Sequence, residues 1–67
     1  MYVSQTMQQV KEEILNGEWV GKLIHMRDTT KSINVTLEPI QSIHGFLEFY
    51  EGQGYGFYKW SQSAISV

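Results

Sequence analysis

The chain has 67 residues, with five lysines and arginines against seven aspartates and glutamates, two histidines and no cysteine. Without cysteine it can form neither a disulfide framework nor a thiolate metal site. Its formal net charge of −2 is of the wrong sign for a protein that binds mainly to phosphates. A chain this short buries only about 60% of its unfolded surface. We therefore expect a single domain over residues 1–67 that gains stability by associating with another chain.

The first predicted element is an amphipathic helix over about residues 5–16. Its apolar residues follow helical spacing and form one stripe: Met7, Val10, Ile14 and Leu15. Thr6 and Gln9 have the spacing of a capping box, and Gly17 suits the residue that ends a helix. We expect the stripe to pack on one face of a sheet.

The pattern after Glu18 changes from helical to extended spacing and predicts four strands. They cover about residues 18–27, 31–38, 43–51 and 55–61. The polar break at residues 28–30 predicts a hairpin between the first two strands, and the glycine-rich residues 52–54 predict a second hairpin, in which Phe49 faces Phe57. The predicted fold class is α+β, with one N-terminal amphipathic helix packed on a four-stranded antiparallel meander sheet.

Apolar and aromatic residues alternate onto both faces of this predicted sheet, whereas one short helix covers only one face. An uncovered aromatic face usually marks an interface. We therefore expect a homo-oligomer, most simply a twofold dimer. The predicted interface consists of large aromatic residues: Phe46, Tyr50, Tyr58, Trp60 and Trp19. We expect the C-terminal residues 64–67 to add a short strand or to reach the partner subunit.

The segment GYGFYKW, residues 54–60, alternates glycine with aromatic residues. It resembles the RNP1 element of RNA-recognition domains and the similar strand of cold-shock domains, in which aromatic side chains stack on bases. The resemblance implies a base- or ligand-stacking role for three side chains: Tyr55, Phe57 and Trp60. The segment departs from the pattern because Gln53 replaces the basic residue and Tyr58 replaces an aliphatic one. We interpret it as a strand that builds the sheet, with an outer face that binds protein rather than nucleic acid.

The two histidines, His25 and His44, lack the close spacing of a metal-ligand pair such as H-x-x-x-H. The sequence contains no nucleophile elbow and no phosphate-binding loop. We therefore predict a protein that is not an enzyme, with no catalytic residues, no metal site and no cofactor.

The N-terminal segment has neither the basic n-region nor the apolar h-region of a signal peptide. No apolar run approaches the roughly 18 residues of a membrane-spanning helix. We expect a cytoplasmic protein without a membrane partner.

The leading hypothesis is a small non-catalytic protein–protein interaction module that acts as a homodimer on an unidentified protein. Its size and composition are those of inhibitors or regulators of bacterial proteins encoded by phages and mobile elements, which would place it in the host cytoplasm. Two alternatives stay open. One is a binder of single-stranded nucleic acid that uses residues 54–60. The other is a small-ligand or nucleotide sponge with a pocket between subunits, formed by Trp19, Tyr58 and Trp60.

Overall fold

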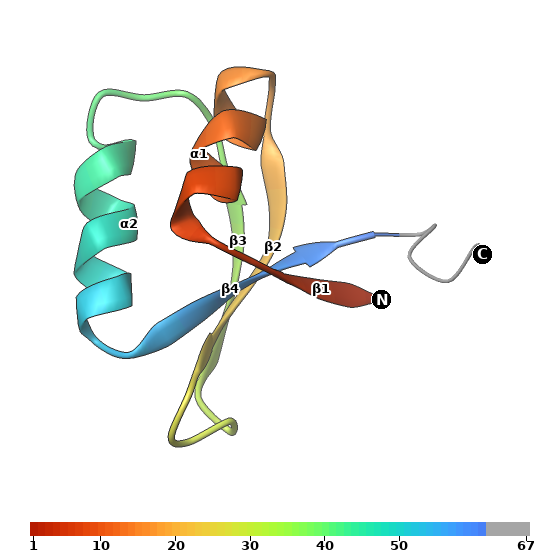
Figure 1. Ribbon diagram of the computed structural model, residues 1–67, viewed down its shortest axis with the longest axis vertical. Helices are drawn as coiled ribbons and strands as arrows, with labels where there is room; N and C mark the ends of the chain where they lie inside the picture. The colour runs from red at the N-terminus through yellow and green to blue at the C-terminus, as the bar shows by residue number, and fades with distance from the viewer. Residues whose placement is uncertain (62–67) are drawn as a thin grey trace.

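The structure is a computed structural model that describes residues 1–61. Along the chain it forms β1 (Tyr2–Gln5), α1 (Met7–Leu15), β2 (Trp19–His25), β3 (Ser32–Leu37), α2 (Ile43–Gly52) and β4 (Tyr55–Trp60). The four strands make one antiparallel sheet, and both helices pack on the same side of it (Figure 1). The predicted α+β class, with a helix near the N-terminus, is confirmed. Residues 64–67, for which we expect a strand or a partner contact, lie outside the described part of the chain.

The strand order, β1-β4-β2-β3, departs from a strict meander. Among the described strands, β2 and β3 form a hairpin, whereas β4 lies between β1 and β2. Each helix joins two strands that run in the same direction on either side of a third. Because such strands cannot be joined by a tight turn, they need a crossover connection. α1 is the crossover from β1 to β2, and α2 is the crossover from β3 to β4.

The prediction of a strand over residues 43–51 is wrong, because this segment forms the helix α2. Its apolar residues also fall at helical spacing, and these are the ones that contact the core: Ile43, Phe46, Leu47 and Tyr50. The aromatic content favours a strand, but strand propensity is easily overridden by packing. The predicted second hairpin therefore does not exist. Gly54, with φ of 90°, lies instead in the connection from α2 to β4, where its N–H donates to the Glu51 carbonyl at 3.0 Å.

The strand β1 is missing from the sequence-based prediction. Its pairing with β4 runs from Tyr2 opposite Trp60 to Gln5 opposite Phe57. Its sequence, Tyr-Val-Ser-Gln, does not alternate between apolar and polar residues, so no periodic pattern indicates a strand. The strand exists because β4, from the other end of the described chain, supplies its hydrogen-bonding partners.

The helix α1 begins at the predicted capping box. The Gln9 N–H donates to Thr6 Oγ1 at 3.1 Å, and the Thr6 N–H donates to Gln9 Oε1 at 2.9 Å. Of the predicted stripe, Val10 and Ile14 are buried and Met7 is partly buried. Leu15 does not belong to the core, because 79% of its surface is exposed.

The core lies between the helices and the sheet. Its buried residues come from both helices and from three strands: Val10, Ile14, Trp19, Leu23, Leu37, Leu47 and Phe57. Trp19 is the largest, and its Nε1–H donates to Gln5 Oε1 at 2.7 Å, which links β2 to the end of β1. Its indole lies over Gly21, where an added Cβ would stand 2.7 Å from Trp19 Cη2 and against the Tyr58 carbonyl oxygen. Position 21 therefore accepts only glycine without a shift of the sheet.

Candidate functional site

Side chains along each strand alternate between the two sides of the sheet. We call the side turned away from the helices the open face. In the observed register it comprises Tyr2 and Ser4 of β1, Gly56, Tyr58 and Trp60 of β4, Val20, Lys22 and Ile24 of β2, and Ser32, Asn34 and Thr36 of β3. Neither α1 nor α2 covers this face (Figure 1).

Large side chains on the open face are partly exposed. The exposed fractions are 40% for Tyr2, 42% for Val20 and 45% for Trp60. The rings of Tyr2 and Trp60 meet edge to face with their centroids 5.1 Å apart. Such a contact orients the two aromatic side chains although both stay partly exposed to water.

Tyr58 extends the aromatic surface toward the β2–β3 turn. An added Cβ on Gly56 would lie 3.2 Å from Tyr58 Cε1 and 3.4 Å from Met26 Cε. The Tyr58 ring therefore leans over Gly56 toward Met26, whose side chain is 70% exposed. Because Gly56 has no side chain, it leaves room for the ring to lie against the sheet.

Lys22 carries the one charge among the strand residues of the open face. Its Nζ stands 4.3 Å from the centroid of the Tyr2 ring, a cation–π contact. Because β4 lies between β2 and β1, the Lys22 side chain must cross β4 to reach this ring. The aliphatic stem therefore lies on the face, and the ammonium group lies toward the β1 edge.

Within residues 1–61, no strand contains an aspartate or a glutamate. All seven carboxylates of the side chains lie on the helices and connections: Glu12, Glu13, Glu18, Asp28, Glu38, Glu48 and Glu51. Apart from Lys22, the two central strands present glycine, apolar and aromatic residues on the open face, and the edge strand β3 presents only Ser32, Asn34 and Thr36. The face thus has a mainly apolar centre, an uncharged polar margin along β3, and one charge, that of Lys22, toward β1.

The structure divides the five residues predicted as an interface. Tyr58 and Trp60 lie together on the open face. Phe46 and Tyr50 are on α2, on the other side of the sheet, and pack against the core. Trp19 is wholly buried, so it has no surface to offer to a partner or to the predicted intersubunit pocket.

The three predicted stacking residues are also separated. Phe57 is only 3% exposed. Tyr55 turns toward the helices, and the centroid of its ring lies 5.5 Å from that of Tyr50 and 5.1 Å from that of His25. Only Trp60 lies on the open face. The alternation of β4 therefore places Gly56, Tyr58 and Trp60 outward, so Trp60 alone of the three residues implied by the RNP1 resemblance is on this face.

The sequence analysis did not identify Tyr2, Val20 and Lys22 of the open face as site residues. Val20 and Lys22 share a face by simple alternation, which is visible in the sequence. Tyr2 carries no such signal, because its position depends on the pairing of β1 with β4.

The two histidines have local partners on separate elements. His25 Nδ1 accepts the N–H groups of Arg27 and Asp28, both at 3.2 Å, and so closes the β2–β3 turn. His44 Nε2 contacts Glu48 Oε1 at 2.6 Å one turn along α2. In the described part of the chain, no three histidine, aspartate or glutamate side chains gather as metal ligands would.

No helix formed by residues 1–61 combines the length and the apolar composition needed to cross a membrane. Comparison with known proteins finds no matching family model, no similar curated protein and no similar solved structure. The function must therefore be argued from the geometry of the open face.

Proposed function

We propose that this protein is a small non-catalytic protein-interaction module that acts as a twofold homodimer joined through the open face. The observation that carries the proposal is the placement of both helices on one side of the sheet, with Tyr2, Val20 and Trp60 left 40–45% exposed on the other. Covering this face with a second copy would bury apolar surface that one chain cannot bury alone.

The chemistry of the open face supports a protein partner. Protein interfaces have an apolar, aromatic centre that is poor in charge, surrounded by a polar rim. Tyr58 and Trp60 lie on the central strand β4, while Ser32 and Asn34 lie on the edge strand β3. The face therefore has the layout of such an interface.

The charge of the open face supports a second copy as that partner. A twofold axis brings the same patch of each subunit together. A charge at the centre of this patch would therefore face the identical charge of the other subunit and be repelled by it. The Lys22 ammonium is held at the Tyr2 ring, toward the β1 edge. A twofold axis near the centre of the sheet would thus leave the two ammonium groups at opposite margins. The helical side of each subunit stays accessible for the protein that the dimer would regulate.

The solution mass of the full chain tests the proposal. Light scattering at tens of micromolar should give twice the 7.8 kDa mass of the chain. Val20→Lys places a charge on the exposed apolar part of the open face and should give a monomer. Phe49→Lys is the matched control, because Phe49 is 59% exposed on α2, away from the open face. A wild-type mass of 7.8 kDa would contradict the proposal, as would a dimer that Val20→Lys leaves intact.

A second candidate function, binding of single-stranded nucleic acid, is favoured by one observation. Lys22, Tyr2 and Trp60 combine a cation with neighbouring exposed aromatic rings, as surfaces that stack bases do. This candidate expects oligothymidylate to quench tryptophan fluorescence, and it expects the quenching to weaken steeply with added salt. Lys22→Gln should then reduce the affinity. A dimer without this quenching supports the first function alone.

A further inference from the structure

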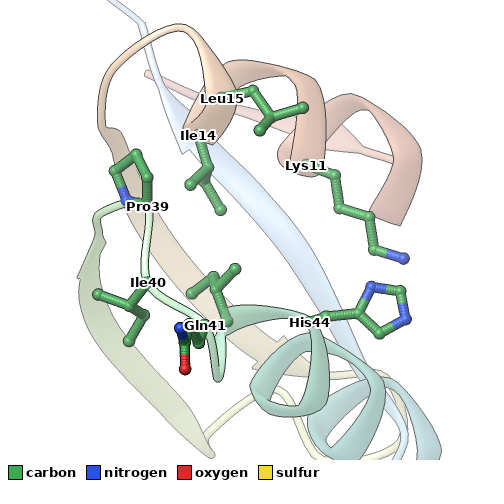
Figure 2. A pocket seen from close by; sticks show the side chains of 8 residues that line it. Lys11, Ile14, Leu15, Pro39, Ile40, Gln41 and His44 are labelled. Carbon is green, nitrogen blue, oxygen red and sulfur yellow. The ribbon is translucent and has the colours of Figure 1, made fainter.

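A second feature of the surface lies on the helical side, away from the open face. It is a pocket of about 570 Å³ between the second half of α1, the connection after β3 and the start of α2 (Figure 2). This volume is in the range of small-molecule sites, about 300–1,000 Å³. Its two sides are far apart in the sequence and are brought together by the packing of both helices on the sheet.

The walls of the pocket are aliphatic. Ile14, Leu15, Pro39 and Ile40 line it. Leu15 is 79% exposed and Ile40 is 56% exposed, although side chains of this kind are usually inside a protein. Leu15 lines the pocket from α1, and Ile40 lines it from the connection after β3 (Figure 2). An apolar ligand body in the pocket would cover part of the exposed surface of both.

Lys11 of α1 places a positive charge at one end of the pocket, and His44 of α2 lies beside it (Figure 2). Lys11 is only half exposed and forms no ion pair within residues 1–61, whereas Lys59 pairs with Glu13 at 2.9 Å. No carboxylate lines the pocket. The carboxylate of Glu48 is outside the pocket, where its Oε1 contacts His44 Nε2.

We propose that this pocket binds a small amphipathic carboxylate, such as a medium-chain fatty acid. The carboxylate would lie at Lys11 Nζ, and the aliphatic body would lie between Leu15 and Ile40. An unpaired ammonium group beside apolar walls complements an anion on an apolar body, because the ion pair forms where water is partly excluded. A neutral ligand of the same shape would gain only the apolar contacts, and a cationic one would be repelled.

Nuclear magnetic resonance titration of the full chain with octanoate tests this site. Octanoate should cause saturable shifts at Leu15, Ile40 and His44, and little change at Tyr2 and Trp60. Octanol should bind about tenfold more weakly, since it lacks the charge-assisted contact. Octylammonium should bind more weakly still. Equal binding of the three ligands, or octanoate shifts confined to the open face, would overturn the proposal.

Substitutions distinguish the contribution of the Lys11 charge to binding from that of the aliphatic walls of the pocket. Lys11→Gln should weaken octanoate binding about tenfold, whereas the matched control Lys31→Gln, in the exposed β2–β3 turn, should bind as the wild type does. Leu15→Glu should abolish binding because it places a carboxylate in the wall of the pocket. Leu15 is largely exposed, so circular dichroism should show an unchanged fold for this variant. Wild-type affinity in both Lys11→Gln and Leu15→Glu would show that octanoate does not use this pocket.

Discussion

Tyr2 and Trp60 stand opposite each other on β1 and β4, with their rings edge to face and their centroids 5.1 Å apart. This contact joins the two ends of the described chain. It continues beyond the strands, where the Ser61 N–H donates to the Met1 carbonyl at 2.8 Å. The same two rings are 40% and 45% exposed on the open face, so the contact between the chain ends and the proposed contact surface share residues.

We expect Tyr2 and Trp60 to be energetically coupled. A double-mutant cycle with Tyr2→Ala and Trp60→Ala, measured by urea unfolding at submicromolar concentration, should give a coupling of about 0.5–1.5 kcal/mol. The low concentration separates this coupling from self-association. Additive effects of the two substitutions would show that the edge-to-face contact contributes nothing in solution.

Gly21→Ala should destabilise the protein by about 3 kcal/mol, because the new Cβ would collide with the Tyr58 carbonyl oxygen and with the Trp19 ring. Gly45→Ala is the matched control. Gly45 lies in α2, and nothing stands within 4 Å of an added Cβ there. This control should stabilise by about 0.5–1 kcal/mol, since alanine is the better helix former. Thermal or urea unfolding gives both values, and equal effects would contradict the packing of β2 against β4.

The neighbouring residues Ile14 and Leu15 should respond very differently to truncation. Ile14→Ala should cost about 2–5 kcal/mol, because Ile14 is 2% exposed in the core. Leu15→Ala should change the free energy of unfolding by no more than about 0.5 kcal/mol, because Leu15 is exposed. Comparable losses for both would mean that α1 is rotated about its axis relative to the structure.

Asp28 should titrate at lower pH than an ordinary aspartate. The Thr30 hydroxyl and the Thr30 N–H both donate to its carboxylate and lower its pKa, with a smaller contribution from Lys31. Since the folded-state pKa lies below the unfolded one, the stabilisation is present above the unfolded value of about 3.9. It is lost as the pH falls through the folded value.

Carboxyl chemical shifts followed by nuclear magnetic resonance measure this titration directly. Thr30→Ala removes the hydroxyl donor and should move the Asp28 pKa upward. If Thr30→Ala leaves the titration midpoint of Asp28 unchanged, the Thr30 hydroxyl is not the cause of the lowered pKa.

The open face could be anticipated only in part. Large aromatic residues near the C-terminus indicated an exposed aromatic surface, and Tyr58 and Trp60 lie on it. Trp19 and Phe57 were misplaced because aromatic content says nothing about which side of a sheet a residue faces. The buried side of the sheet is the side on which the helices pack. One of these helices is α2, which is in the same core as Phe57 and which the sequence analysis predicts as a strand.

Local contacts explain what the sequence determined by itself. Thr6 and Gln9 satisfy each other's backbone groups three residues apart, so the start of α1 needs no distant partner. The β2–β3 hairpin likewise depends on a short polar turn that joins its strands. In this turn the Thr30 N–H donates to Asp28 Oδ1. Such short-range interactions can be inferred from neighbouring residues alone.

Only the tertiary structure decided the remaining elements. Residues 43–51 suit both a strand and a helix, and the helix prevails because it buries Leu47 in the core. β1 becomes a strand, and β4 takes its place between β1 and β2, through hydrogen bonds between opposite ends of the described chain. The physical reason is that these choices depend on which distant surfaces are buried together, and that burial exists only once the sheet and both helices have assembled.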